Sequence, residues 1–250
     1  MSEGAIRSIV RSIQVLQAIN RFGSLTLSEI AQHADIPYPT AMRILRTLQD
    51  QGLIEREPAR KRYRPTALVQ TLSCGYQNYD RLVTTARQHI VELTRSLGWP
   101  ISLATRVGQA MVVRDSTSSL TTLTFNNYYP GWRVPLLASA SGRVYLAHAA
   151  EDERKILLDN LSPEEASQYM VDFDQIRKQG YAAVTRTAYS ANPGMTSSIA
   201  VPLFEGETLH GALALVFFAK ALTLTEAIDR FLSPLQRTAK IINDELVAKG

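Results

Sequence analysis

Residues 38–52 read YPTAMRILRTLQDQG, and this stretch has the spacing of a helix with one buried face. Its apolar residues recur three and four positions apart, which places them on one side of a helix; they are Ala41, Ile44, Leu45 and Leu48. The opposite side carries Arg43, Arg46, Thr47 and Asp50. Pro39 suits the first helical turn, and Gly52 suits a C-terminal stop. The sequence predicts an amphipathic helix over residues 38–51 with a polar, basic outer face.

A shorter helical pattern precedes this helix. Leu27, Ile30, Ala31 and Ala34 share one face, and Ser28 is expected to cap the start. A tight connection through residues 35–37 then makes a helix-turn-helix unit. An earlier helix, within residues 8–22, is expected to complete a small core with these apolar residues: Ile9, Ile13, Leu16 and, just before it, Ile6.

Residues 53–65 read LIEREPARKRYRP, which is typical of two short strands joined by a turn. The strands are expected at 53–56 and 61–64, with Arg60, Lys61 and Arg62 at the tip of the hairpin. Three helices followed by a basic hairpin predict a winged helix-turn-helix. Residues 1–64 hold ten Lys and Arg against six Asp and Glu, so the whole formal net charge of +4 lies there. A basic segment beside a neutral body favours contact with a polyanion.

An exposed helix of this kind fits the major groove of DNA, where arginine can donate two hydrogen bonds to guanine. The candidates for groove contacts are Thr40, Arg43, Arg46 and Thr47. The hairpin tip is expected to hold the DNA backbone or enter the minor groove. Arg7 and Arg11 are candidates for phosphate contacts, with plain solvation as the alternative. The helix starts add three further candidate DNA-binding residues: Ser28, Tyr38 and Pro39.

The chain resembles the IclR family of bacterial transcriptional regulators along its whole length. The resemblance rests on SIVRSIQVLQAI (residues 8–19), on residues 25–56, on PLLASASGRVYLA (residues 135–147) and on SSIAVPL (residues 197–203). Within the family it is most similar to the MhpR-type regulators of hydroxyphenylpropionate catabolism. The resemblance implies a winged helix-turn-helix at residues 1–64, a linker helix at 65–80, and a GAF-like effector-binding and oligomerisation domain at 81–250.

The pattern after residue 80 predicts an α+β domain, an antiparallel sheet flanked by helices. Strands are expected at 101–106, 110–115, 120–125, 182–187, 197–204 and 209–218. Helices are expected up to Gly98 and at 141–150, 152–160, 163–170, 174–179 and 224–247.

The last two strands alternate bulky and small residues. Ile199, Val201 and Leu203 oppose Thr196, Ser198 and Ala200, and Leu215 opposes Ala214 and Val216. The bulky face is expected to pack on helices. The small, partly hydroxylated face predicts either the floor of a ligand pocket or a bed for a closely packed helix.

A helix beginning near Ser139 or Ser141 would present backbone N–H groups that attract anions. In the IclR family the effector lies near this turn and the late strands. The resemblance therefore implies this pocket lining: Ser139, Ser141, Gly142, Thr196, Ser198, Ala214 and Val216. Tyr128, Tyr129 and Trp132 are expected to close over an aromatic carboxylic acid. Its candidate counter-ions are Arg106, Arg114, Arg133 and Arg143, among which the sequence does not choose.

No hydrolase, metalloprotease, P-loop or dinucleotide motif is visible, and the four histidines are widely separated. We expect no enzyme, no cofactor and no metal. The amino terminus lacks the hydrophobic run of a secretory signal, and no apolar segment approaches a bilayer span, which predicts a cytoplasmic protein. The expected partners are a near-palindromic DNA operator, an organic acid and a second copy of the chain. Pairing of dimers into tetramers and contact with RNA polymerase stay open. The alternative is a DNA-binding dimer whose large domain is purely structural.

Overall fold

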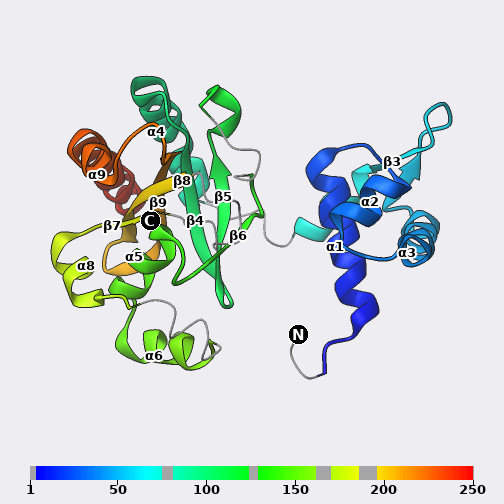
Figure 1. Cartoon of the computed structure of the whole chain (residues 1–250), viewed down its shortest axis with the longest axis horizontal. Helices are drawn as coiled ribbons and strands as arrows, with labels where there is room; N and C mark the ends of the chain where they lie inside the picture. The colour runs from blue at the N-terminus through cyan, green and yellow to red at the C-terminus, as the bar shows by residue number, and fades with distance from the viewer. Residues whose placement is uncertain (1–3, 75–80, 124–128, 162–169, 186–195, 250) are drawn as a thin grey trace. The chain divides into compact units, whose positions relative to one another are not determined.

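The computed structural model describes residues 4–74, 81–123, 129–161, 170–185 and 196–249 (Figure 1). The chain folds as two compact units, residues 1–80 and residues 81–250. In both units helices pack against an antiparallel sheet, so the α+β prediction is confirmed. Within the described ranges, no helix combines the length and apolar character that crossing a bilayer requires.

Three helices and a small sheet build the first unit. The helices are α1 (Arg7–Phe22), α2 (Leu27–His33) and α3 (Tyr38–Asp50). The strands are β1 (Leu25–Thr26), β2 (Ile54–Arg56) and β3 (Arg62–Pro65), in the sheet order β1, β3, β2, and a 3₁₀ helix, η1 (Ala67–Ser73), follows them. The predicted winged helix-turn-helix is confirmed, and the hairpin of residues 54–65 is its wing. In the region predicted as a linker helix (residues 65–80), the structure has the 3₁₀ helix η1, which ends at Ser73, and residues 75–80 lie outside the described residues.

The helix-turn-helix forms as predicted, except at the start of α2. The buried residues of α3 are Ala41, Leu45 and Leu48. The cap of α2 is Thr26, whose hydroxyl accepts a hydrogen bond from the Glu29 amide, while the Glu29 carboxylate accepts one from the Thr26 amide. The prediction that Ser28 caps this helix is wrong, because Ser28 already lies inside the first turn.

The buried face of α1 differs from the predicted one. Three predicted core residues are largely exposed: Ile6 (61%), Ile9 (53%) and Ile13 (49%). Val15, Ala18 and Ile19 are buried in their place, in the core shared with α2 and α3. α1 carries two apolar stripes, and the core of the unit meets mainly the second half of the helix. The stripe in that half is therefore the buried one.

A six-stranded antiparallel sheet forms the centre of the second unit (Figure 1). In sheet order its strands are β6 (Arg133–Pro135), β5 (Ala110–Ser116), β4 (Ile101–Val107), β9 (Thr208–Phe218), β8 (Thr196–Glu205) and β7 (Ala182–Thr185). The helices are α4 (Arg81–Leu97), α5 (Ala140–His148), α6 (Glu151–Asp159), α8 (Phe173–Gln179) and α9 (Leu224–Ala248), with a 3₁₀ turn, η3 (Ser118–Leu120).

One edge of this sheet differs from the expectation. The prediction of a strand at residues 120–125 is wrong for residues 120–123, since Leu120 ends η3 and residues 121–123 are irregular. Residues 124 and 125 lie outside the described residues. The edge strand is β6 instead, where Val134 pairs with Met111. Three residues are too few to display a period of two, so the pattern did not reveal β6. The helix expected at 163–170 falls almost wholly outside the described residues.

The two faces of the sheet differ in side-chain size, as predicted. The bulky face packs on α4 and α9 through residues that include Leu103, Ile199 and Leu215. The small face, with Ala200 and Ala212, packs on α5. α5 also packs closely on the segment that precedes it, because a Cβ on Gly142 would overlap the carbonyl oxygen of Leu136. Part of the small face lies beneath α5, as one of the two alternatives predicted, and part lines a small hollow.

Candidate nucleic-acid interface and ligand pocket

A groove between α1 and α3 brings together five of the predicted DNA-binding residues. Its volume is about 480 Å³, and it is open to solvent. Its lining is Arg7, Ser8, Arg11, Ser12, Thr40, Arg43, Ile44 and Thr47. The hydroxyl of Thr47 donates a hydrogen bond to the carbonyl of Arg43 (3.1 Å), so Thr47 can still accept one from a ligand. Residues that were predicted on two separate helices thus lie together on one basic surface.

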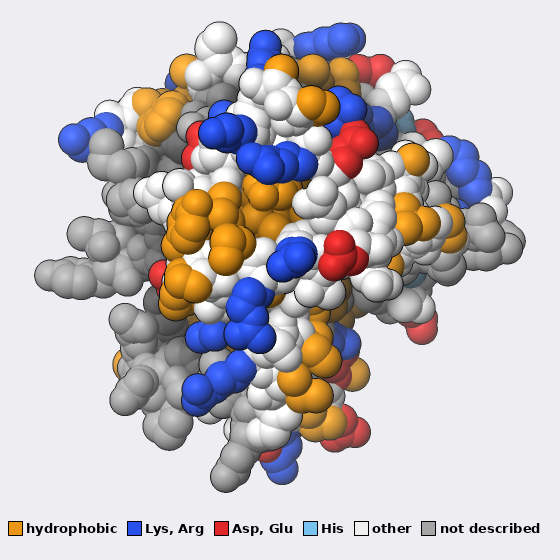
Figure 2. Space-filling view, turned by 90° about the vertical axis from the view of Figure 1, so that its right-hand side faces the viewer, with side chains coloured by type: hydrophobic (Ala, Val, Ile, Leu, Met, Phe, Trp, Pro, Cys, Tyr) orange, Lys and Arg blue, Asp and Glu red, His pale blue; other side chains and the backbone are white. Residues whose placement is uncertain are grey.

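The outer side of α3 continues this surface. Arg46 is exposed there, as are Tyr38 and Pro39 at the start of the helix. Met42 is also exposed, and the sequence analysis did not single it out. Figure 2 shows the face of the first unit, where basic side chains lie with hydrophobic ones between them and few acidic ones nearby. Such a surface complements the charge of nucleic acid.

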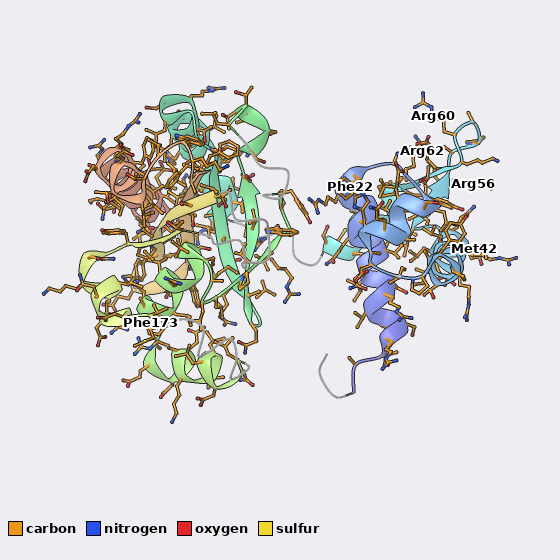
Figure 3. The ribbon with its side chains drawn as sticks, in the orientation of Figure 1. Phe22, Met42, Arg56, Arg60, Arg62 and Phe173 are labelled. Atoms are coloured by element: carbon orange, nitrogen blue, oxygen red, sulfur yellow. The ribbon has the colours of Figure 1, made fainter. Side chains whose placement is uncertain are left out.

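The wing places its basic residues in two different environments. Arg60 and Lys61 are exposed in the turn, and Figure 3 shows Arg60 at the far end of the wing. Lys61 has a φ of 52°, in the left-handed region that non-glycine residues seldom adopt. Arg62 lies in β3 instead of the tip and is half-buried. Arg56 is a further exposed wing arginine that the sequence analysis did not list among the candidates.

Arg62 is held inside the first unit by several hydrogen bonds. Its Nη2 donates to the Ser24 carbonyl oxygen (2.8 Å) and lies 3.0 Å from Oε2 of Glu29, while its Nε donates to the Ser24 hydroxyl (3.3 Å). Hydrogen bonds from the backbone and side chain of Thr26 lower the pKa of Glu29, with a smaller contribution from the charge of Arg62. The side chain of Arg62 therefore fixes the wing to α2, which differs from the predicted role at the hairpin tip.

A hollow in the second unit contains five of the predicted effector residues. Its volume in this structure is about 10 Å³, roughly the size of one water molecule. The predicted residues in its lining are Ser139, Ser141, Ser198, Ala214 and Val216, and the others are Ser102, Ala104, Val113 and Val134. The strand β4 was predicted, but not its place in the lining. Ser102 and Ala104 alternate with the larger Ile101 and Leu103, which is the same pattern that predicted a pocket face on β8 and β9.

The start of α5 forms one end of the hollow. Ser139 caps the helix: its hydroxyl accepts a hydrogen bond from the Gly142 amide (3.0 Å) and donates one to the Pro135 carbonyl (2.7 Å). The hydroxyls of Ser139 and Ser141 lie 3.3 Å apart. Amides in the first turn of a helix point outward and carry partial positive charge. This end of the hollow therefore suits an anion.

Two predicted lining residues have other positions. Gly142 faces the Leu136 backbone, where it permits close packing. Thr196 is buried at the first position of β8, opposite Phe218, and is not part of the lining in the described part of the chain. Trp132 packs against Val113 and Val216 at the hollow. Tyr128 lies outside the described residues.

None of the four candidate counter-ions is in the lining of the hollow, and three of them bond to other residues of the second unit. Nε of Arg143 donates to the Leu137 carbonyl (2.6 Å). Arg106 donates to the hydroxyl of Tyr145 (3.3 Å) and pairs with Glu153 (2.9 Å), and the bond to Tyr145 is the main cause that raises the pKa of Arg106. Arg114 donates to Thr105 (3.4 Å). Arg133 is exposed on β6. Helix amides and serine hydroxyls are thus the groups placed to bind an anion in the hollow.

The described residues hold no cluster of three or more potential metal ligands. Sequence models of one family match both units: "Bacterial transcriptional regulator IclR C-terminal" at residues 75–244 and "IclR helix-turn-helix domain" at residues 8–58. The HTH-type transcriptional regulator BhcR of Paracoccus denitrificans is 30% identical over 220 residues, which cover 83% of this chain and 76% of BhcR.

Solved structures of the same family share the fold of the whole chain. The IclR of Thermotoga maritima has a TM-score of 0.67 at 21% identity and covers 97% of this chain and 100% of its own. An IclR homolog from Microbacterium hydrocarbonoxydans has a TM-score of 0.69 at 22% identity, over 96% of this chain and 99% of its own. With a winged helix-turn-helix, a basic α1–α3 groove and family matches over both units, this chain belongs to the IclR family of DNA-binding bacterial transcriptional regulators.

Proposed function

We propose that the second unit binds a small aromatic carboxylic acid in the hollow between α5 and the sheet, and that this acid controls DNA binding or transcription activation by the first unit. The observation that carries the proposal is the lining itself, in which apolar Val113, Val134 and Val216 face hydroxyl groups at the start of α5. The ring would lie on the valines. The carboxylate would accept hydrogen bonds from the first-turn amides and from Ser141.

The chemistry of the lining and the fold of a relative support this class of ligand. The cavity itself is only about 10 Å³, roughly the size of one water, so a single-ring acid would enter only if the lining side chains moved apart. The Microbacterium hydrocarbonoxydans homolog was crystallised with 4-hydroxybenzoate, a compound of this class. The resemblance to MhpR-type regulators points to hydroxyphenylpropionates as a second group to test. These likenesses favour aromatic acids over aliphatic ones.

Control would operate as a population shift. A ligand that binds one arrangement of the protein more tightly raises the population of that arrangement and so changes affinity for DNA. We further propose a homodimer on a near-palindromic operator, since two recognition helices related by a two-fold axis read two half-sites. The assignment of residues 1–64, 65–80 and 81–250 to DNA binding, linkage and effector binding stays a prediction. So do a cytoplasmic location, the absence of catalysis, and contact with RNA polymerase.

Thermal unfolding of the purified protein against hydroxybenzoates, phenylacetates, hydroxyphenylpropionates and short aliphatic acids tests the proposal. Binding to the folded state adds about 2.7 kcal/mol at a ligand concentration 100 times the Kd. One class should raise the unfolding temperature, and Ser141→Ala should reduce that shift. Ser96→Ala, an exposed serine on α4, is the matched control and should leave the shift unchanged.

Two outcomes would count against an effector site in the hollow. The first is an unfolding temperature that no acid raises. The second is a shift equally large in the Ser141→Ala and Ser96→Ala proteins. The first outcome would favour a DNA-binding dimer whose second unit is purely structural.

A further inference from the structure

Two apolar side chains are exposed on the outer side of α3. Met42 is 52% exposed and Tyr38 is 51% exposed. They lie one helical turn apart, so they share one side of the helix. Figure 3 shows Met42 on the side of α3 that faces away from the core. The buried side of the helix is already filled by Ala41, Leu45 and Leu48, so Met42 has no role in the core of the unit.

The surroundings of Met42 are strongly basic. Arg43 follows it on the helix and lines the α1–α3 groove, and Arg46 is exposed one turn further on. Met, Tyr and Arg are also enriched at protein–protein interfaces, so these residue types alone do not choose between a protein and DNA. The basic α1–α3 groove beside Met42 and the net charge of +4 in residues 1–64 favour DNA, whose protein interfaces are polar and positively charged.

Major-groove chemistry offers one apolar group at the base edges. Guanine, cytosine and adenine present hydrogen-bond donors and acceptors there, and thymine adds its 5-methyl group. The thioether of methionine is flexible and polarizable, which suits contact with a methyl group. Resting on the proposed function of α3 as the recognition helix, we infer that Met42 reads a thymine in each operator half-site through the 5-methyl group. That thymine lies beside the base pair that Arg43 or Arg46 reads.

The test begins with selection of bound duplexes from a random-sequence DNA pool by the full-length protein. Each thymine of the enriched sequence is then replaced by deoxyuridine, which lacks only the 5-methyl group. Loss of one methyl contact should weaken binding about fourfold, by the usual contribution of one buried apolar carbon. The effect should occur at one thymine per half-site and vanish in Met42→Ala, whose affinity for the two DNAs should be equal.

Two variants serve as controls. Met42→Leu keeps an apolar side chain of similar size and should keep most of the discrimination. Ile156→Ala truncates an exposed apolar residue of α6 in the second unit and should change neither affinity nor sequence preference. Alanine and leucine both favour helix, so α3 should remain folded, which circular dichroism can verify.

The outcomes separate this inference from the proposed function. If the wild-type protein enriches no sequence, the DNA-reading role of α3 itself fails, and the inference fails with it. If a sequence is enriched but no deoxyuridine substitution weakens binding, the role of Met42 is overturned while DNA recognition stands. The same holds if Met42→Ala discriminates thymine from deoxyuridine as well as the wild type does.

Discussion

Arg62 on β3 and Glu29 on α2 form an ion pair, with 3.0 Å between Nη2 and Oε2. The same carboxylate accepts hydrogen bonds from the amide of Thr26 (2.7 Å) and from its hydroxyl (3.0 Å). Thr26 also pairs with Arg62 across β1 and β3. The wing and the start of α2 are thus joined through one carboxylate.

Arg62→Ala should lower the thermal unfolding temperature of the protein, because it removes the hydrogen bonds to Ser24 and the ion pair with Glu29. Arg60→Ala, on the exposed turn of the same hairpin, is the matched control and should leave that temperature unchanged. Differential scanning calorimetry compares the two. Equal unfolding temperatures for the two variants would show that Arg62 does not anchor the wing.

Arg43→Ala and Lys61→Ala should weaken DNA binding in different ways. Loss of a bidentate contact to a base costs about 1–3 kcal/mol and falls mainly on the specific sequence. Loss of a phosphate contact weakens all sequences nearly alike and reduces the salt slope by about one. Fluorescence anisotropy with selected and scrambled duplexes over a salt series measures both. Equal losses for Arg43→Ala on the two duplexes would refute a base-reading role.

Gly142→Ala should destabilise the second unit even without ligand. The added Cβ overlaps the backbone of Leu136, and overpacking of this kind typically costs about 1–3 kcal/mol. Ser141→Ala, the neighbouring change in α5, adds no atoms and should cost less. Urea unfolding monitored by tryptophan fluorescence compares the two variants. A Gly142→Ala protein as stable as the wild type would mean that the segment around Leu136 can move away.

The protein should lose stability as the pH falls below about 6.5, partly through His148. Burial lowers the pKa of His148 below its ordinary value of 6.5, despite the hydrogen bond between its Nδ1 and the Val144 carbonyl (2.9 Å). The unfolded chain therefore binds a proton at His148 more readily than the folded chain does. The contribution of His148 to the free energy of unfolding is complete above pH 6.5 and is lost as the pH falls through the lower pKa of the folded state.

His148→Gln should remove that part of the pH dependence. Urea unfolding of both proteins at pH 7.5 and pH 5.5 provides the measurement. His33→Gln, on α2 of the first unit, is the matched histidine variant and should not alter the pH dependence that belongs to His148. Identical pH dependence in wild-type and His148→Gln proteins would contradict the prediction.

Periodicity predicted the long elements, because each has one buried face. α3, β8, β9 and α9 lie within one or two residues of the expected positions. α1 shows the limit of the method: two apolar stripes on one helix satisfy the same spacing, and only the position of the core selects Val15 and Ile19 over Ile9 and Ile13. β6 was missed because three residues are too short for a pattern.

The candidate sites likewise contain residues that the sequence predicted and residues that it did not. Charge and spacing identified the residues of the α1–α3 groove, since exposed arginines depend little on tertiary packing. The role of Arg62 could not be predicted, because its bond to the Ser24 carbonyl depends on how β1 meets β3. Gly142 was predicted to line the pocket. Its actual role, to let α5 pack against the backbone of Leu136, depends on the path of residues 135–137, which the sequence pattern does not give.

The alternation of the central sheet has a consequence for how this protein could be re-engineered. In the central parts of β4, β8 and β9 the even-numbered positions, such as Ser198 and Ala214, lie on the side of the hollow, and their odd-numbered neighbours, such as Ile199 and Leu215, lie in the core with α4 and α9. A library of variants that alters the hollow can therefore change the even-numbered positions of these strands and leave the core residues as they are. The odd-numbered Val113, Ser139 and Ser141, which line the hollow from β5 and the start of α5, form a second set of positions to vary.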